Sequence, residues 1–186
     1  MLMRVITGTA RGRRLLTPDG ADTVRPTSEK VKEAIFSAIQ FDIEGRRVLD
    51  LFAGSGQLGI EALSRGAASA VFVDSSGTSL GIVKKNLEIT GFSEKATVIS
   101  GDYSAFLLRC DKQFDIVFLD PPYKSGFLPD ALAKVSPHLS DYGFVFCEHP
   151  TGAVLPDTVS GLKIRRTYKF GTVSVTMYIK DVTDDE

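Results

Sequence analysis

Residues 48–59 read VLDLFAGSGQLG, and this stretch decides the fold. It begins as a short apolar run with one acid, which is typical of a buried strand. Gly54, Gly56 and Gly59 then follow with the spacing of a turn that joins a strand to a helix and borders a ligand site. Asp74 ends the next apolar run, about 20 residues on, as this pattern requires. A glycine turn needed only for packing is the alternative, and the coincidence of strand, glycines and acid favours the ligand site.

Short apolar runs and helical stretches alternate along the rest of the chain. The expected strands are 48–52, 70–74, 96–100, 114–119 and 143–148, and the expected helices are 56–65, 78–90, 103–110 and 127–138. Such alternation predicts a parallel sheet with helices on both faces. Residues 162–170 and 173–179 alternate around Gly171-Thr172 and predict an antiparallel hairpin at one sheet edge. The sequence therefore predicts an α/β, Rossmann-like single domain with a mixed, mostly parallel seven-stranded sheet.

The amino-terminal segment is basic. Residues 4–7 and 14–16 are expected to pair as a small β-hairpin through Gly8 and Gly12. The first 14 residues hold four arginines and no acid, whereas the whole chain has a net charge of −1. A basic hairpin on a slightly acidic body indicates contact with nucleic acid. A solvated surface hairpin fits the charges equally well.

A helix is expected to follow this hairpin, with Thr27 as its N-cap. Apolar residues recur at helical spacing on one face, so Lys30 and Lys32 are expected to lie in water. We divide the chain into a basic hairpin extension over residues 1–24, a main domain over residues 25–180 and an acidic mobile tail over residues 181–186.

Size and composition indicate a globular protein with one core. The chain has 186 residues, of which 43% are hydrophobic, and no apolar run approaches the roughly 20 residues that a membrane span needs. No signal-peptide pattern is found at the start, so a cytoplasmic location is expected. Cys110 and Cys147 are expected to be buried thiols, and the spacing of the cysteines and histidines predicts no metal site.

Charge discriminates between the cofactors that a glycine loop can hold. Asp50 precedes the loop, where a carboxylate would repel a pyrophosphate, which disfavours a dinucleotide. S-adenosylmethionine carries an ammonium and a sulfonium in its methionyl part, so Asp50 would attract it. Asp74 could then accept hydrogen bonds from the ribose hydroxyls. Asp102 could accept one from the adenine amino group or could instead cap a helix.

Asp120-Pro121-Pro122-Tyr123 follows the apolar run 114–119. Two prolines cannot continue a strand, because they lack amide donors and fix φ. The strand therefore ends by presenting a carboxylate, a free carbonyl and an aromatic ring. This set suits a flat substrate with an amino group, which offers N–H donors and a face for stacking.

Together these stretches resemble a known family. Residues 48–56 with the Asp-Pro-Pro-Tyr segment are similar to class I S-adenosylmethionine-dependent methyltransferases that act on exocyclic amines. With residues 11–15, 25–27 and 59–66, the chain resembles the RsmD family, which methylates guanine N2 in small-subunit (16S) ribosomal RNA. The resemblance runs from about residue 4 to residue 179. It implies S-adenosyl-L-methionine as cofactor and ribosomal RNA as partner, either free or with ribosomal proteins. No membrane contact is expected. The sequence does not determine the oligomeric state, and a monomer is compatible with it.

The resemblance also implies which residues act. The carboxylate of Asp120 and the carbonyl of Pro121 would each accept an N–H bond from the target amine, and Tyr123 would stack on a base that has left its helix or loop. The implied catalytic segment is Asp120, Pro121, Pro122 and Tyr123. The implied cofactor-binding residues are Asp50, Phe52, Ala53, Gly54, Ser55, Gly56, Asp74, Asp102 and Tyr103, and the implied RNA-binding residues are Arg11, Arg13, Arg14, Arg25 and Lys30.

Three other functions compete with this interpretation. An amino-methyltransferase for another target, adenine N6 in nucleic acid or a protein glutamine, would use the same strand ends. A non-catalytic RNA-binding assembly factor would keep the fold but should have broken motifs, and here both motifs are whole. A dinucleotide-dependent oxidoreductase is disfavoured by Asp50.

Overall fold

The computed structural model describes residues 3–18, 28–123 and 126–181. Its helices and strands alternate as expected, and most boundaries agree with the sequence analysis to within one or two residues. The helices are α1 (Glu29–Ala38), α2 (Gln57–Ser64), α3 (Gly77–Thr90), α4 (Tyr103–Arg109) and α5 (Leu128–Val135), with short 3-10 turns at Ser93–Lys95 and Ser136–His138. The strands are β1 (Arg47–Leu51), β2 (Ser69–Asp74), β3 (Ala96–Ser100), β4 (Phe114–Leu119), β5 (Leu139–Pro150), β6 (Thr158–Val159), β7 (Leu162–Phe170) and β8 (Val173–Lys180).

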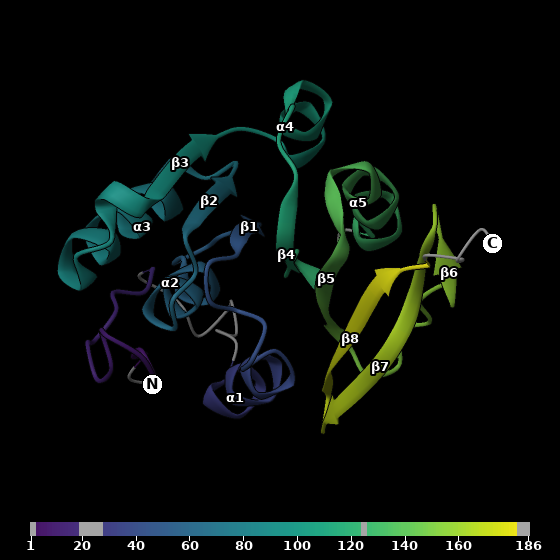
Figure 1. Cartoon of the computed structure of the whole chain (residues 1–186), viewed down its shortest axis with the longest axis horizontal. Coiled ribbons are helices and arrows are strands. Elements are labelled where there is room, and N and C mark those ends of the chain that lie inside the picture. The colour runs from purple at the N-terminus through teal and green to yellow at the C-terminus, as the bar shows by residue number, and fades with distance from the viewer. Residues whose placement is uncertain (1–2, 19–27, 124–125, 182–186) are drawn as a thin grey trace.

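The strands form one sheet in the order β3-β2-β1-β4-β5-β8-β7-β6 (Figure 1). The first five are parallel to one another, and β8, β7 and β6 join them in antiparallel pairs. The expected carboxyl-terminal hairpin is confirmed as β7 and β8. The expected count of seven strands is wrong, because the chain before β7 folds back and Thr158–Val159 pairs with Leu162 and Lys163 as an eighth strand.

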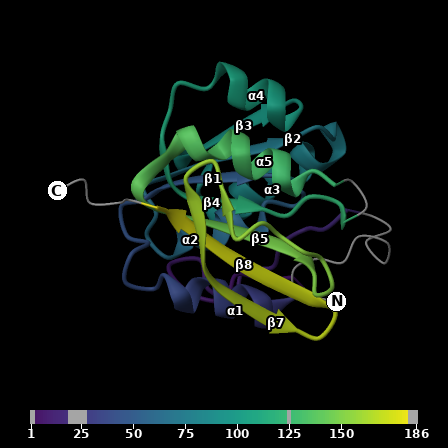
Figure 2. The same ribbon diagram turned by 90° about the vertical axis from the view of Figure 1, so that its right-hand side faces the viewer.

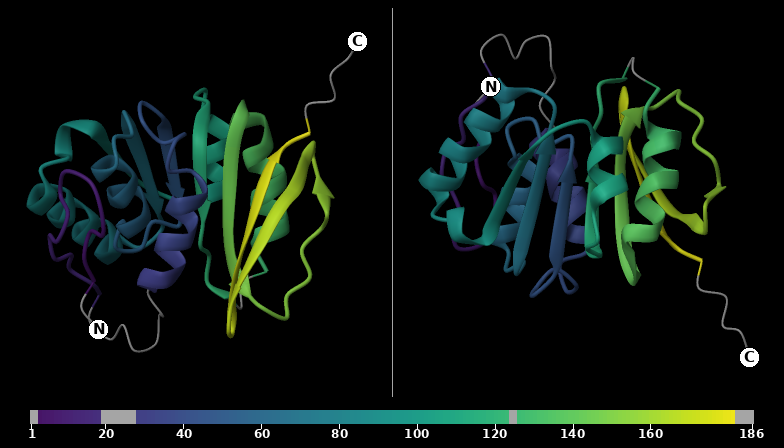
Figure 3. Two further views of the ribbon diagram at one scale, coloured as in Figure 1. Left: turned by 60° about the horizontal axis from the view of Figure 1, so that its bottom comes forward. Right: turned by 90° about the horizontal axis from the view of Figure 1, so that it is seen from above.

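Helices cover both faces of the sheet. Helices α1, α2 and α3 lie on one face, and α4 and α5 on the other (Figures 1 and 3). Two core clusters result, one under each helical layer. The central strand β4 is buried at every position, as a parallel strand between two helical layers must be.

The amino-terminal residues fold back on the α1–α3 face as a hairpin, here called the arm (residues 3–16). Its two halves meet at a single antiparallel bridge between Arg4 and Arg14. Val5, Ala10 and Leu15 belong to the core cluster of that face. Because the arm covers α2 from outside, all eight residues of that helix are buried. The expected basic hairpin is therefore present and packed onto the domain, whereas the proposed division at residue 24 lies outside the described residues.

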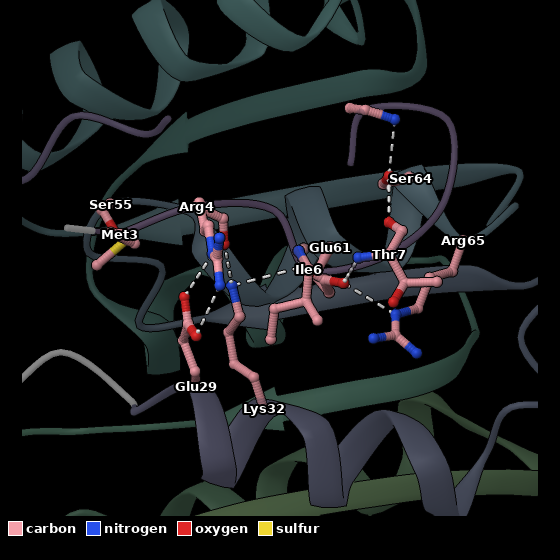
Figure 4. A network of polar contacts seen from close by, with 12 residues as sticks. Met3, Arg4, Ile6, Thr7, Glu29, Lys32, Ser55, Glu61, Ser64 and Arg65 are labelled. Carbon is pink, nitrogen blue, oxygen red and sulfur yellow. Dashed lines mark hydrogen bonds and ion pairs between the residues drawn. The ribbon is translucent and has the colours of Figure 1, made fainter. Parts of the chain in front are cut away.

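Two expectations about α1 are wrong. Its N-cap is Ser28, whose side chain accepts from the amide of Val31, and not Thr27, which lies outside the described residues. Lys32 does not lie in water, since its side chain is only 1% exposed. Its Nζ donates to the carbonyl of Arg4 at 2.8 Å and lies 3.3 Å from Oε2 of Glu61 (Figure 4). The arm covers a side of α1 that the sequence pattern predicts to be exposed to solvent. Lys30 is exposed, as expected.

Cys147 is buried as expected, whereas Cys110 is only partly buried. Within the described ranges, no helix combines the length and apolar character that crossing a bilayer requires. The expected tail over residues 181–186 lies, apart from Asp181, outside these ranges.

Candidate functional site

The carboxyl ends of four parallel strands meet at one edge of the sheet. Asp74 ends β2, Asp102 follows β3, Asp120 follows β4, and Asp50 lies one residue before the end of β1. The strand register keeps these ends level, since Asp50 pairs with Phe118 on one side and Phe72 on the other. In an open α/β sheet this edge is where ligands bind.

The glycine loop after β1 has the backbone that its sequence predicts. Gly54 and Gly56 have φ of +56° and +78°, a region that favours glycine. A Cβ on Gly59 would lie 2.3 Å from Cε1 of Phe72, so this glycine allows α2 to approach β2. A Cβ on Gly54 would meet nothing within 4 Å. Packing therefore explains Gly59, whereas Gly54 is required by the turn itself.

Asp50 lies beneath this loop and is 2% exposed. Its Oδ2 accepts from the amide of Gly59 at 3.0 Å, which ties the strand to the first turn of α2. Burial raises the pKa of Asp50 to about 7, against the lowering effect of the Gly59 hydrogen bond, and the charge of Asp74 adds to the rise. The acid is thus beside the loop as expected, in a site that favours its protonated form until a cation approaches.

Asp74 and Asp102 each fasten backbone amides. Asp74 accepts from Gly54 at 2.9 Å through Oδ2 and from Ser76 at 2.8 Å through Oδ1. Asp102 caps α4, accepting from Ser104 at 2.9 Å and Ala105 at 3.1 Å. The helix-cap alternative for Asp102 is confirmed, and its contact with an adenine stays a prediction, as does the ribose contact of Asp74. A cavity of about 430 Å³ begins at Asp102 and continues between β3 and α4, without contacting Asp120.

Three aromatic rings gather beside the glycine loop. The ring of Phe52 lies 5.2 Å from that of Tyr103 and 6.3 Å from that of Phe127, between centroids. Phe52 has φ of +141°, a strained value for a non-glycine residue, and such strain concentrates at functional sites. Tyr103 donates to Asp130 at 2.6 Å, and its pKa is raised to about 12, first by burial and then by this bond.

Phe52 and Tyr103 are among the site residues predicted from the sequence, whereas Phe127 is not. The only sequence signal for Phe127 is an aromatic residue just before the helix start at Leu128-Pro129. That signal fits an ordinary core residue equally well. Because Phe127 is 39% exposed, its ring remains accessible at this edge of the sheet.

The Asp-Pro-Pro-Tyr segment lies at the end of β4. Asp120 is half-buried, Pro121 is buried and Pro122 is exposed. Tyr123 is 42% exposed, and its Oη donates to Oε1 of Glu148 at 2.7 Å. Glu148 belongs to β5, where the pairing of Leu119 with Cys147 sets it beside Asp120. This buried acid was missed, although an acid within the apolar run 143–148 was the available signal.

The arm's arginines lie apart from these groups. Arg11, Arg13 and Arg14 are exposed, and the arm's turn contacts Ser64, the last residue of α2, through the amides of Thr9 and Ala10. Helix α2 begins at the glycine loop and runs away from it. The turn therefore lies about 12 Å along that helix from the loop. Arg25 is outside the described residues, and Lys30 is exposed in the first turn of α1.

The other end of the arm touches the glycine loop. Asn86 of α3 donates to the carbonyls of Leu16 and Ser55, at 3.0 and 2.9 Å, and accepts from the amide of Leu16. The Ser55 hydroxyl lies 3.4 Å from Sδ of Met3. Ser55 and Ala53 are themselves buried. Over the described part of the chain, no three His, Cys, Asp or Glu side chains gather as a metal site.

Comparison with known proteins identifies close relatives. The model of the family described as conserved hypothetical protein 95 matches residues 3–179. YlbH of Bacillus subtilis is 42% identical, with 96% of this chain and 99% of that protein aligned. Ribosomal RNA small subunit methyltransferase D of Escherichia coli is 32% identical over 96% of this chain and 90% of its own length. The solved structure of yhhF from Escherichia coli superposes with a TM-score of 0.86 at 33% identity, covering 98% of this chain and 100% of that one.

Proposed function

Because the chain belongs to the conserved hypothetical protein 95 family, the RsmD family, we propose that it is an S-adenosylmethionine-dependent methyltransferase of ribosomal RNA. More finely, we propose that it methylates the exocyclic N2 amine of a guanine in small-subunit ribosomal RNA. A relative named ribosomal RNA small subunit methyltransferase D aligns over almost the whole chain, which supports the class of reaction. The finer target is supported by the chemistry of the strand ends.

The residues around the glycine loop fit this cofactor. When bound, S-adenosylmethionine supplies a methyl group on a cationic sulfur. The buried Asp50 and the loop it fastens suit a cationic ligand better than a pyrophosphate. Asp74 lies at the ribose position of the pattern, and the rings of Phe52 and Tyr103 offer an apolar wall beside it. Ala53, Ser55 and Gly56 complete the loop.

The chain's own groups would orient the target amine. The lone pair of a guanine N2 amine is delocalised into the ring, so the amine is a poor nucleophile. Asp120 and the carbonyl of Pro121 would each accept one of its N–H bonds, which directs the lone pair toward the methyl group. Asp120 would also receive the proton that leaves after transfer. Tyr123 would stack on the base, and Glu148 holds the hydroxyl of that tyrosine.

One observation carries the proposal. The carboxylate of Asp120, two prolines without amide donors and the tethered ring of Tyr123 directly follow β4, the strand next to β1 and its glycine loop. A packing role alone does not require Tyr123 to be 42% exposed while its hydroxyl is held by a buried acid. This arrangement presents acceptors and a ring together, as a flat amino-bearing base requires.

Replacing Asp120 tests the proposal. Asp120→Ala should lower the rate of methyl transfer to small-subunit ribosomal RNA by about 10²–10³-fold, as loss of a transition-state contact does. Its affinity for S-adenosylhomocysteine, measured by calorimetry, should stay close to wild type. Glu88→Ala removes an exposed acid of α3 and should change neither value.

Mass spectrometry of nucleosides from the methylated RNA identifies the target. N2-methylguanosine supports the proposal, and N6-methyladenosine would move the activity to the competing amino-methyltransferase class. Cofactor binding without any transfer by the wild-type protein would favour the non-catalytic assembly factor.

A further inference from the structure

The carboxyl-terminal hairpin carries positive charge that the candidate site does not use. Residues 162–180 contain five lysines and arginines and no acid. Three of these bases, Arg165, Arg166 and Lys169, are exposed on β7. We call these three residues the β7 basic surface.

These three cations differ from the other bases of the hairpin in their ion pairing. The other two bases of the hairpin are paired, Lys163 with Asp181 and Lys180 with Asp141. Across residues 3–18, 28–123 and 126–181, the β7 basic surface makes no ion pair with an acid. Arg166 instead lies over the ring of Tyr168, with its Cζ 5.1 Å from the ring centroid, which holds the guanidinium without cancelling its charge.

The register of the sheet places this surface level with the candidate active site. Strand β7 is antiparallel to β8, and β8 is antiparallel to β5, so β7 ends at the same sheet edge as β5. Tyr168 pairs with Val175, which pairs in turn with Glu148. Two strand spacings, about 10 Å, therefore separate the backbone of Tyr168 from that of Glu148, the acid that accepts from the hydroxyl of Tyr123.

The β7 basic surface is also open to a large partner. Strand β6 pairs only with Leu162 and Lys163, so β7 is the outer strand of the described sheet from Ile164 onward. Figure 2 shows β7 running along the outer side of the molecule, in front of β8. Charged side chains on an edge strand can also serve only to prevent edge-to-edge aggregation, and the experiment must separate the two roles.

We propose that the β7 basic surface binds phosphates of the same RNA whose base is presented to Asp120. The proposal rests on the proposed function and extends it with a second anchoring surface. An RNA strand that has one base held at Asp120 needs to cross only β5 and β8 to reach these cations. Each phosphate neutralised by Lys or Arg releases counterions, so the contact makes binding steeply dependent on salt.

The test compares two variants of equal charge change. In the first, Arg165, Arg166 and Lys169 are all changed to Gln. In the control, Lys95, Arg109 and Lys112, exposed bases near β3 and α4, are changed to Gln. Binding of a labelled transcript of small-subunit ribosomal RNA is measured by fluorescence anisotropy over a series of KCl concentrations, with S-adenosylhomocysteine at saturation. The oligomeric state of each variant is measured by light scattering.

The first variant should bind the RNA at least about tenfold more weakly, and the slope of log affinity against log salt should fall by about 2–3, roughly 0.9 for each phosphate contact. The control should keep the wild-type slope. An unchanged slope in the first variant overturns the proposal, and so does aggregation with unchanged RNA affinity. Failure of the wild-type protein to bind or methylate the RNA would instead refute the proposed function.

Discussion

Asp50 lies beneath the glycine loop, where burial raises its pKa to about 7. An acid with a raised folded-state pKa holds its proton in the folded protein while the unfolded chain has already released it. Between about pH 4 and pH 7, unfolding therefore releases a proton, and raising the pH favours unfolding. A bound cation next to Asp50 would reverse this effect by stabilising the carboxylate.

Asp50→Asn isolates this contribution. The amide oxygen of Asn can still accept from Gly59, but the side chain no longer ionises. Relative to wild type, the ligand-free variant should gain stability as the pH rises from 4 to 7, by up to about 4 kcal/mol. Urea unfolding at several pH values measures the difference in the free energy of unfolding. A difference that does not change with pH would mean that Asp50 is not protonated in the folded protein.

The residues of the candidate site differ in how well the sequence predicts them. Asp50, Gly54 and Asp74 were predictable, because a strand, a turn and a second strand fix them by local spacing. Glu148 and Phe127 were not. They reach the site through strand register and helix packing, which bring together residues distant along the chain. For Asp102, local spacing allowed both a helix cap and a ligand role, and the structure confirms the cap.

The arm shows the same limit for a whole element. Its pairing and charge were predictable from Gly8, Gly12 and the arginines, but its docking was not. Glu61 of α2 accepts from the amides of Ile6 and Thr7 at 2.8 and 3.0 Å and from Arg65 at 2.9 Å, while Lys32 closes the network (Figure 4). The helical pattern places Lys32 off the apolar face of α1, and it gives no indication that another element will cover this side chain.

Gly8 tests how tightly the arm is docked. A Cβ on Gly8 would lie 1.8 Å from the carbonyl oxygen of Ser64, whereas a Cβ on Gly12 would meet nothing within 4 Å. Both glycines have positive φ, of +91° and +81°. Gly12→Ala should therefore lower the free energy of unfolding by about 1 kcal/mol for backbone strain alone, and Gly8→Ala by clearly more, because it also displaces the arm.

Hydrogen exchange locates the effect of these two variants. In Gly8→Ala the amides of Ile6, Thr7 and Thr9 should lose protection, since their acceptors are Glu61 and Ser64. In Gly12→Ala they should stay protected. Equal protection in both variants would mean that the arm is held independently of its contact with Ser64.

At the scale of the whole molecule, exposed basic residues lie on the arm and on β7, with α1 between these two elements. The arm lies over α2, and β7, the strand that carries the β7 basic surface, lies toward the far edge of the sheet (Figures 1 and 2). Arg166 pairs opposite Met177, which belongs to the core cluster under α1, α2 and α3. Directly opposed residues of an antiparallel pair share a face, so Arg166 and the arm lie on the same face of the sheet.

One RNA could therefore contact the arm and Arg166 together while a base reaches Asp120 at the sheet edge. Lys169, which pairs opposite Ser174, lies on the other face of the strand. Changing Arg11, Arg13 and Arg14 to Gln should weaken RNA binding and lower the salt slope by about 2–3. If both surfaces hold the same RNA at once, combining these changes with those on β7 should lower the slope by the sum of the two single effects. If only one of the two surfaces holds the RNA, the combined variant should lose no more than the larger of the two single effects. The same salt titration distinguishes the two outcomes, because contacts made at the same time release their counterions in a single binding event and their contributions to the slope add.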